Sequence, residues 1–194
     1  MADEVRPGYE LYFAYGSNML EQRLTKRVKS AEFFSNAWIR GYEVRFRKIS
    51  IDGSGKADLV QTGNPEDIVH GVVYQFDPYE RDALNEAERG YDRTPIQVHT
   101  DCGDRDVTTY LARRGRIDES LKPYTWYRDL ILCGAEQHGM PEDYRGKLGK
   151  IHGIPDPDEN RREKRKAEGQ MQEYLSLRKL PIKDITGTSS EIFT

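Results

Sequence analysis

The chain has few of the residues from which metal centres and disulfide frameworks are built. Among its 194 residues there are two cysteines and four histidines. Cys102 and Cys133 lack the spacing of a zinc site, and a single pair does not make a disulfide framework. The histidines show neither HExxH nor HxH spacing. The sequence therefore predicts no metal site, and we expect both thiols to be reduced.

Long apolar runs and an excess of one charge are also missing. No stretch approaches the roughly 20 apolar residues that cross a bilayer, and the N-terminal MADEVRPGYE lacks the features of a signal peptide. The 30 Lys and Arg residues nearly balance the 33 Asp and Glu residues, for a formal net charge of −3. Nucleic-acid-binding proteins are usually basic. We therefore expect a cytoplasmic protein that binds neither membranes nor nucleic acids.

Two common catalytic motifs are absent as well. The chain has no GxSxG nucleophile elbow. GSGK at residues 53–56 lacks the strand-to-helix context of a phosphate-binding loop, and we interpret it as a hairpin turn. Nothing in the sequence favours a serine or cysteine nucleophile, so other side chains must supply any chemistry.

Hydrophobic periodicity predicts an α+β domain with a curled, partly antiparallel sheet. Strand patterns come first, at residues 10–15, 38–49, 57–62, 69–76, 94–100 and 106–112. Helices are expected at residues 19–27, with Ser17 or Asn18 as the N-cap, and at 77–89, 125–138, 141–150 and 157–180. We divide the chain into a domain at residues 10–150 and a charged C-terminal helical extension at residues 151–194.

One strand runs into a turn that suits an anionic ligand. It belongs to the segment Tyr12, Phe13, Ala14, Tyr15, Gly16, Ser17, Asn18 and Met19. A Gly-Ser-Asn turn before a helix gathers backbone N–H groups, which can hold a carboxylate or an oxygen that gains negative charge. Gly16 permits close approach, and Ser17 and Asn18 add side-chain donors. A strand-turn-helix is also a plain structural connection in many folds, so the motif alone leaves both interpretations open.

This segment resembles the signature of the γ-glutamylcyclotransferase family, which includes plant AIG2-like and bacterial BtrG-like proteins. The family pattern, a strand ending in YFAYGSN, appears unbroken. Three further segments resemble the family: GVVYQF with LNEAERGY at residues 71–76 and 84–91, TTYLA at 108–112, and the helix pair of the animal-type enzymes at 127–148. The resemblance covers about residues 10 to 148. It implies a small mixed, mostly antiparallel β-barrel flanked by helices.

The resemblance also implies an activity and the residues that perform it. Family members close a γ-glutamyl group into 5-oxoproline without a metal or organic cofactor, as acyltransferase- or lyase-type enzymes of glutathione metabolism. Glu88 corresponds to the catalytic glutamate, and Tyr110 and residues 12–18 to the substrate-binding set. One departure is Arg89, which separates Glu88 from the following glycine. The family tyrosine that follows the catalytic glutamate is therefore either Tyr91 or has no equivalent.

The expected reaction needs a proton acceptor, because the α-amine that attacks the γ-carbonyl is protonated at neutral pH. A partly buried carboxylate with a raised pKa suits that task, and we assign it to Glu88 as general acid and base. On position alone Glu88 would be a solvated glutamate at a helix end. Tyr12, Tyr15 and Tyr110 are likewise interpretable as core aromatics of a small barrel. The family resemblance favours the catalytic interpretation of Glu88, and both interpretations of the tyrosines can hold together.

Three substrate hypotheses remain open at this point. The first is a γ-glutamyl amino acid or dipeptide. The second is a γ-glutamyl amine or a γ-glutamyl-protected metabolite, and the third is a non-catalytic AIG2-like protein that binds a small metabolite. A glutathione-specific subfamily is disfavoured, because its loop resembles YGSL rather than YGSN. Animal-type members are dimers, and the thin apolar face of the last predicted helix would suit a homodimer interface.

Overall fold

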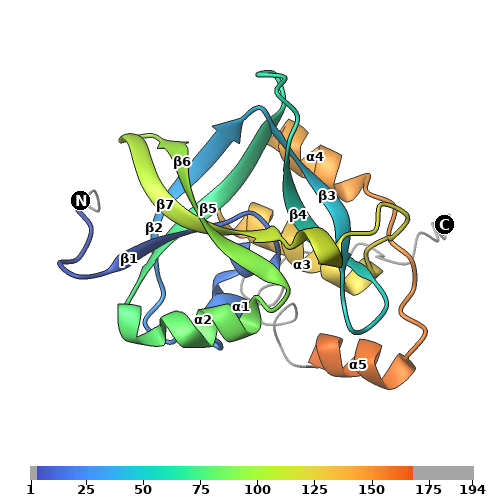
Figure 1. The fold of residues 1–194 in the computed structure, drawn as a ribbon. Helices are drawn as coiled ribbons and strands as arrows, with labels where there is room; N and C mark the ends of the chain where they lie inside the picture. The colour runs from blue at the N-terminus through green and yellow to red at the C-terminus, as the bar shows by residue number, and fades with distance from the viewer. Residues whose placement is uncertain (1–3, 168–194) are drawn as a thin grey trace, which may run out of the picture.

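Five strands close a barrel in the computed structural model, which describes residues 4–167 (Figure 1). All neighbouring pairs are antiparallel except β1 and β7, which run parallel where Tyr12 faces Thr108. The expected mixed, mostly antiparallel barrel is therefore confirmed. Its order is β1 (Glu10–Ala14), β5 (Ile68–Phe76), β2 (Glu32–Arg40), β6 (Tyr91–Thr100) and β7 (Gly103–Ala112), beside a two-stranded sheet of β3 (Tyr42–Ile49) and β4 (Gly55–Gln61).

Helices cover one end and one side of the barrel (Figure 1). Three are short 3-10 turns: η1 (Ser17–Met19), η2 (Pro78–Glu80) and η3 (Arg114–Arg116). The α-helices are α1 (Glu21–Thr25), α2 (Arg81–Ala87), α3 (Thr125–Gln137), α4 (Glu142–Gly149) and α5 (Glu159–Ala167). In Figure 1, α1 and α2 lie together below the barrel, and α5 lies below the β3–β4 hairpin.

Strand β5 is buried along most of its length. Val72, Val73 and Tyr74 are completely buried, and β5 pairs with β1 on one side and β2 on the other. A strand whose two faces are both covered must be apolar on both, because unpaired polar groups there would lose water without compensation. Gly71 lies in the same strand, where an added Cβ would come within 2.5 Å of the Ala14 carbonyl oxygen. The β1–β5 contact therefore requires glycine there.

The single strand predicted at residues 38–49 is wrong. Gly41 has a φ of +76°, a left-handed conformation that L side chains avoid, and it ends one strand and starts another. Arg40 pairs with Ile68 inside the barrel, whereas Tyr42 pairs with Gln61 in the smaller sheet. The sequence showed Gly41 as an interruption of one strand, but it did not show that the chain changes sheet there.

The short helix after the Gly-Ser-Asn turn also differs from its prediction. α1 begins at Glu21, and neither Ser17 nor Asn18 caps it. Both residues instead belong to the 3-10 turn η1, with their side chains engaged by other partners that are described below. The first N–H groups of such a turn have no partner within the helix, so the donors expected at this corner are retained.

The remaining predicted elements lie close to their expected positions. The hairpin of β6 and β7 is longer than predicted, since the pairing extends from Thr100 and Gly103 to Tyr91 and Ala112. GSGK lies at the β3–β4 hairpin, as expected, where Ile49 faces Gly55. The helix predicted at residues 157–180 begins as α5, and residues 168–180 lie outside the described part of the chain. Residues 151–194 as a separate extension remain a prediction.

Packing of α3 against the 3-10 turn η1 gives a test of how the loop is held. A Cβ on Gly134 would lie 2.7 Å from both the Leu20 nitrogen and the Met19 Cβ. Alanine favours a helix over glycine by about 1 kcal/mol, but overpacking against backbone typically costs about 1–3 kcal/mol. We therefore expect Gly134→Ala to lower the free energy of unfolding, measured by urea denaturation. Gly146→Ala in α4 is the control, because nothing lies within 4 Å of its added Cβ. Equal stability of the two variants would contradict this packing.

Candidate active site

Glu88 lies at the C-terminal end of α2, where the chain reverses into β6. Its backbone N–H donates to the Leu84 carbonyl, and Gly90 then adopts a φ of +86°. This geometry turns Glu88 inward, leaving its side chain 15% exposed. Arg89 instead points to solvent, 76% exposed, and pairs with Glu86. The residue inserted between Glu88 and Gly90 is therefore accommodated without moving the carboxylate out of the interior.

Asn18 connects this carboxylate to the Gly-Ser-Asn turn. Its Nδ2 donates to Glu88 Oε1 at 2.6 Å and to the Tyr12 hydroxyl at 3.2 Å. Its Oδ1 accepts a hydrogen bond of 2.9 Å from Arg27, whose guanidinium also lies 3.9 Å from Glu88 Oε1. Two segments about 70 residues apart in the sequence thus meet through one amide side chain. The structure therefore brings together the glutamate and the turn that the sequence singled out.

Burial raises the pKa of Glu88 above the ordinary carboxyl value. The positive charges of Arg27, Arg23 and Lys48 and the hydrogen bond from Asn18 oppose this shift, but desolvation is the largest cause. With these neighbours Glu88 can still ionise, and its carboxylate is more basic than that of an exposed glutamate. That combination suits a group that accepts a proton from an amine and later returns it.

Glu88 faces a cavity of about 160 Å³ at the end of the barrel. Most predicted site residues line it: Tyr12, Tyr15, Gly16, Ser17, Asn18, Glu88 and Tyr110. Phe13 and Ala14 are not in its lining, and both are completely buried in the core. Because they belong to the barrel wall, any contribution they make to a ligand site is through packing of β1.

Tyrosines surround the glutamate and are fixed by hydrogen bonds. Tyr15 donates to the Tyr110 carbonyl at 2.5 Å, and the Tyr110 hydroxyl donates to Asn85 at 2.7 Å. Tyr91 lines the cavity and donates to the Ala57 carbonyl at 2.7 Å. Burial raises the pKa of Tyr12, Tyr15 and Tyr91 well above 10, and that of Tyr110 to about 12, so these phenols stay neutral.

Four cations in the cavity wall were missed by the sequence analysis: Arg23, Arg27, Lys48 and Lys56. Arg23 is 5% exposed and donates from Nε to the Ser17 hydroxyl at 3.1 Å. Burial lowers its pKa to about 9, which still leaves it protonated at neutral pH. Arg23 and Arg27 are four residues apart, the spacing of one helical face. That spacing directly after the turn was the available signal.

Lys56 sits among aromatic rings at the far side of the cavity. Its Nζ lies 4.6 Å from the ring centroids of Trp126 and Tyr127 and 2.8 Å from Asp52. Burial lowers the pKa of Lys56 to about 8, although the Asp52 carboxylate favours the charged form. Cation–π contacts of this kind are strongest where water is excluded. Lys56 therefore holds Tyr127 in place, and the Tyr127 hydroxyl in turn accepts from the Ala57 N–H.

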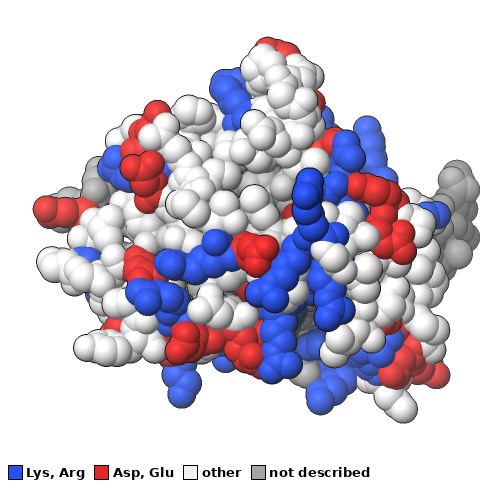
Figure 2. Space-filling model, in the orientation of Figure 1, with Lys and Arg blue, Asp and Glu red and all other residues white. Residues whose placement is uncertain are grey.

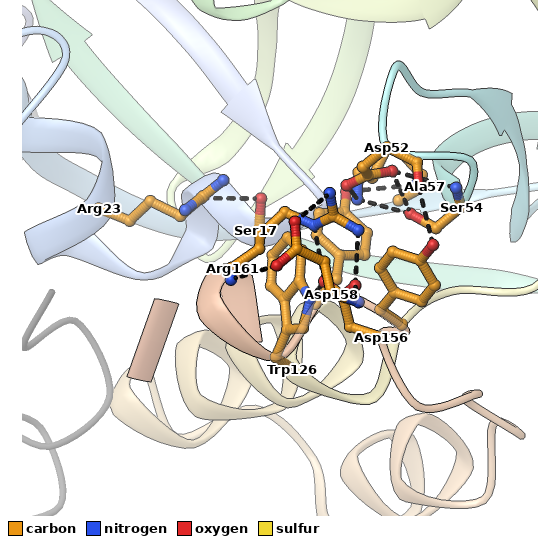
Figure 3. Close-up of polar contacts among 12 residues, drawn as sticks. Ser17, Arg23, Asp52, Ser54, Ala57, Trp126, Asp156, Asp158 and Arg161 are labelled. Carbon is orange, nitrogen blue, oxygen red and sulfur yellow. Dashed lines mark hydrogen bonds and ion pairs between the residues drawn. The ribbon is translucent and has the colours of Figure 1, made fainter. Parts of the chain in front are cut away.

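The helix α5 reaches the outer side of the same aromatic wall (Figure 3). Arg161 bonds to the buried carboxylate of Asp156, which also accepts from the Trp126 indole N–H at 2.9 Å. The guanidinium of Arg165 lies 5.4 Å from the centroid of the Trp126 ring. The Trp126 indole thus contacts both α5 and Lys56, whose side chain lines the cavity.

No cluster of three potential metal ligands of the His, Cys, Asp or Glu type exists between residues 4 and 167. Over the same part of the chain, no helix is both long and apolar enough to cross a membrane. The polar groups that line the cavity are one carboxylate, four cations, the η1 turn and several neutral phenols. This arrangement defines a small barrel suited to acid–base chemistry on a small anionic ligand.

Comparison with known proteins identifies the family. The family model for gamma-glutamyl cyclotransferase, AIG2-like, matches residues 12–129. Human gamma-glutamylcyclotransferase is 32% identical over 154 residues, covering 73% of this chain and 78% of that protein. The bovine (Bos taurus) protein of the same name is 30% identical over 150 residues, with the same coverage. The chain therefore belongs to the AIG2-like gamma-glutamyl cyclotransferase family.

Solved structures agree with this assignment. A gamma-glutamyl cyclotransferase structure matches with a TM-score of 0.72 and 28% identity, over 82% of this chain and 99% of that one. YkqA from Bacillus subtilis matches with a TM-score of 0.61 and 20% identity, over 75% of this chain and 56% of that one. The second likeness concerns the fold alone.

Proposed function

We propose that this protein is a γ-glutamylcyclotransferase that releases 5-oxoproline from a γ-glutamyl amino acid or dipeptide. The observation on which this proposal depends is the hydrogen bond between Glu88 and Asn18 across the cavity. It joins an acidic group of raised pKa to the turn that resembles the family signature. The names of the relatives, which are gamma-glutamylcyclotransferases, support the same activity.

In the proposed reaction Glu88 carries protons from the attacking nitrogen to the leaving nitrogen. The carboxylate takes a proton from the α-ammonium of the γ-glutamyl group, and the freed amine attacks the γ-carbonyl of the same group. A C–N bond closes the five-membered lactam while the original amide C–N bond breaks. Glu88 donates this first proton to the leaving nitrogen as the amide bond breaks. The regenerated carboxylate then takes the second proton from the ring nitrogen and passes it to the released amine. Both reacting atoms belong to one substrate, so the protein mainly orients them and moves the proton.

The opposite wall of the cavity would bind the charged parts of the glutamyl group. We assign the η1 turn, with Ser17 and Asn18, to the α-carboxylate or to the oxygen that becomes negative during attack. Arg23 and Arg27 strengthen this assignment, because each is hydrogen-bonded to a side chain of the turn. Tyr12, Tyr15 and Tyr110 would pack against the carbon chain. Neutral phenols do this without competing for the proton.

The finer expectations are part of the same proposal. We place the enzyme in the cytoplasm and in glutathione metabolism, acting as an acyltransferase- or lyase-type enzyme. The balanced charge of the chain supports a freely diffusing enzyme of small metabolites. Homodimer formation remains an expectation from the animal-type relatives. The apolar residues that suggested an interface, Met171, Tyr174 and Leu175, lie outside the described part of the chain.

The direct test is to incubate the protein with γ-glutamyl amino acids, γ-glutamyl peptides and γ-glutamyl amines, and to measure 5-oxoproline by mass spectrometry. We expect release from the amino-acid conjugates. Release from amine conjugates alone would reassign the substrate to a γ-glutamyl amine or a protected metabolite. No product from any conjugate, with binding retained, would identify a non-catalytic metabolite-binding protein.

A further inference from the structure

A second cavity, of about 320 Å³, borders the proposed active site, and Lys48 lines both. Its wall comes from the end of β3, the β3–β4 turn, the Gly90 turn and η3. The residues are Lys48, Ile49, Ile51, Arg89, Gly90, Arg113 and Arg116, so every charged member is basic. Lys and Arg side chains gather in this part of the surface, between α2 and the β3–β4 hairpin (Figure 2).

Two of these cations form ion pairs with carboxylates in the described part of the chain and two do not. Arg89 pairs with Glu86, and Arg113 pairs with Asp92 at 2.8 Å. Among residues 4–167, no carboxylate lies within ion-pair distance of Lys48 or Arg116. Salt bridges are otherwise common on this chain, so these two positions are the basic groups of the cavity that remain available to an anion.

Lys48 and Arg116 are also neighbours. Both approach the Gly90 turn: a Cβ on Gly90 would lie 3.0 Å from Lys48 Cε and 3.9 Å from Arg116 Cγ. Burial is the main cause that lowers the pKa of Lys48, and the positive charge of Arg116 adds to it, whereas the charges of Glu88 and Asp52 oppose it. An anion bound between the two would relieve the repulsion. The glycine at this position keeps the space between them open.

Apolar side chains line the same cavity as the two cations. Ile51 is fully exposed, and Ile49 is also partly exposed, in the wall of the same cavity. Lys48 Nζ lies 4.9 Å from the centroid of the Tyr91 ring, on the border with the first cavity. A ligand with a short carbon chain and two anionic ends would match these surfaces. A neutral amine would leave both cations without a partner.

We propose that the second cavity binds the leaving group, and that Lys48 and Arg116 select leaving amino acids with a second carboxylate. This inference rests on the proposed function. With the glutamyl group between the η1 turn and Glu88, the scissile amide lies near Glu88, and the leaving group extends past Lys48 toward Arg116. A neutral leaving amino acid has one carboxylate, whereas aspartate or glutamate has two. Two carboxylates match the two cations, Lys48 and Arg116, that form no ion pair among the described residues.

The test compares two substrates of nearly equal shape, γ-glutamyl-L-aspartate and γ-glutamyl-L-asparagine. We expect kcat/KM to be about ten-fold or more higher for the aspartate conjugate, because a hydrogen bond to a charged group is worth at least that factor. Lys48→Met and Arg116→Met should each reduce this ratio several-fold, chiefly through KM. Arg114→Met, in the same 3-10 turn but outside both cavities, should leave the ratio unchanged.

A ratio near one in the unmodified protein, or a ratio unchanged in both Met variants, would overturn the inference while leaving the proposed function intact. If no γ-glutamyl conjugate of the full panel yields 5-oxoproline, the proposed function fails, and calorimetry then decides the inference separately. Tighter binding of the aspartate conjugate that is lost in Arg116→Met would support it, and equal binding of both conjugates would refute it. Arg116 is exposed, so its variant should fold even if Lys48→Met does not.

Discussion

Glu88→Gln is expected to reduce kcat for 5-oxoproline release by about 100-fold or more, because general acid–base groups typically contribute 10²–10⁴-fold. Glutamine keeps the size of the side chain and an oxygen that can accept from Asn18, so the cavity should keep its shape. Only the ability to take a proton from the α-ammonium is lost. Steady-state kinetics on a γ-glutamyl amino acid, with 5-oxoproline as the measured product, gives the result.

Glu86→Gln is the matched control. Glu86 is two residues away, 61% exposed and paired with Arg89, so the same change should leave kcat unaltered. Near-normal turnover by Glu88→Gln would show that Glu88 does not transfer the proton.

The same variant should be more stable than the unmodified protein at alkaline pH. Burial raises the pKa of folded Glu88 above 4.5, so ionisation costs folding free energy as the pH rises through that raised value. Below pH 4.5 the side chain is neutral in both states and the difference vanishes. Melting temperatures of the two proteins should therefore agree at pH 4 and diverge at pH 8, with Glu88→Gln higher.

Asn18→Leu has the second largest expected effect, a fall in kcat/KM of about 100-fold, comparable to loss of one oxyanion-hole donor. Leucine fills similar space but donates no hydrogen bond to Glu88 and accepts none from Arg27. Since the Asn18 hydrogen bond lowers the pKa of Glu88, its loss should raise that pKa further. The acid limb of the pH profile of kcat/KM should then move to higher pH.

Asn160→Leu serves as the control, because Asn160 is exposed on α5 and outside the cavity. Its activity and pH profile should match those of the unmodified protein. If Asn18→Leu lowers the rate but leaves the acid limb of the pH profile unchanged, Asn18 does not control the pKa of Glu88. Its role would then be confined to holding the η1 turn.

Local motifs predicted the parts of the site that depend on short segments. The strand, the Gly-Ser-Asn turn and the helix ending near Glu88 are each encoded within about ten residues, so residue type and spacing were sufficient. Family resemblance then joined them into one hypothesis. Closure of the barrel was implied by that resemblance alone, because β1 and β5 pair across some 60 residues without a local signal.

The cations of the cavity show where sequence reasoning stops. Arg23 lies on α1 and Arg27 lies two residues after its end, and their partners are side chains of the turn itself. Lys48 and Lys56 face each other across the β3–β4 pair, and both line the cavity. The sequence interpretation treated the segment with Lys56 only as a hairpin turn. Their convergence depends on how the small sheet is placed against the barrel.

The position of Trp126 has a consequence for how this enzyme can diverge. Its indole contacts Lys56, which lines the cavity, and also Asp156 and Arg165. The family match ends at residue 129, before α5 begins. A change in α5 is therefore connected, through one indole, to an ammonium group in the wall of the cavity. Substitutions in α5 should thus alter the kinetic constants while the barrel stays the same.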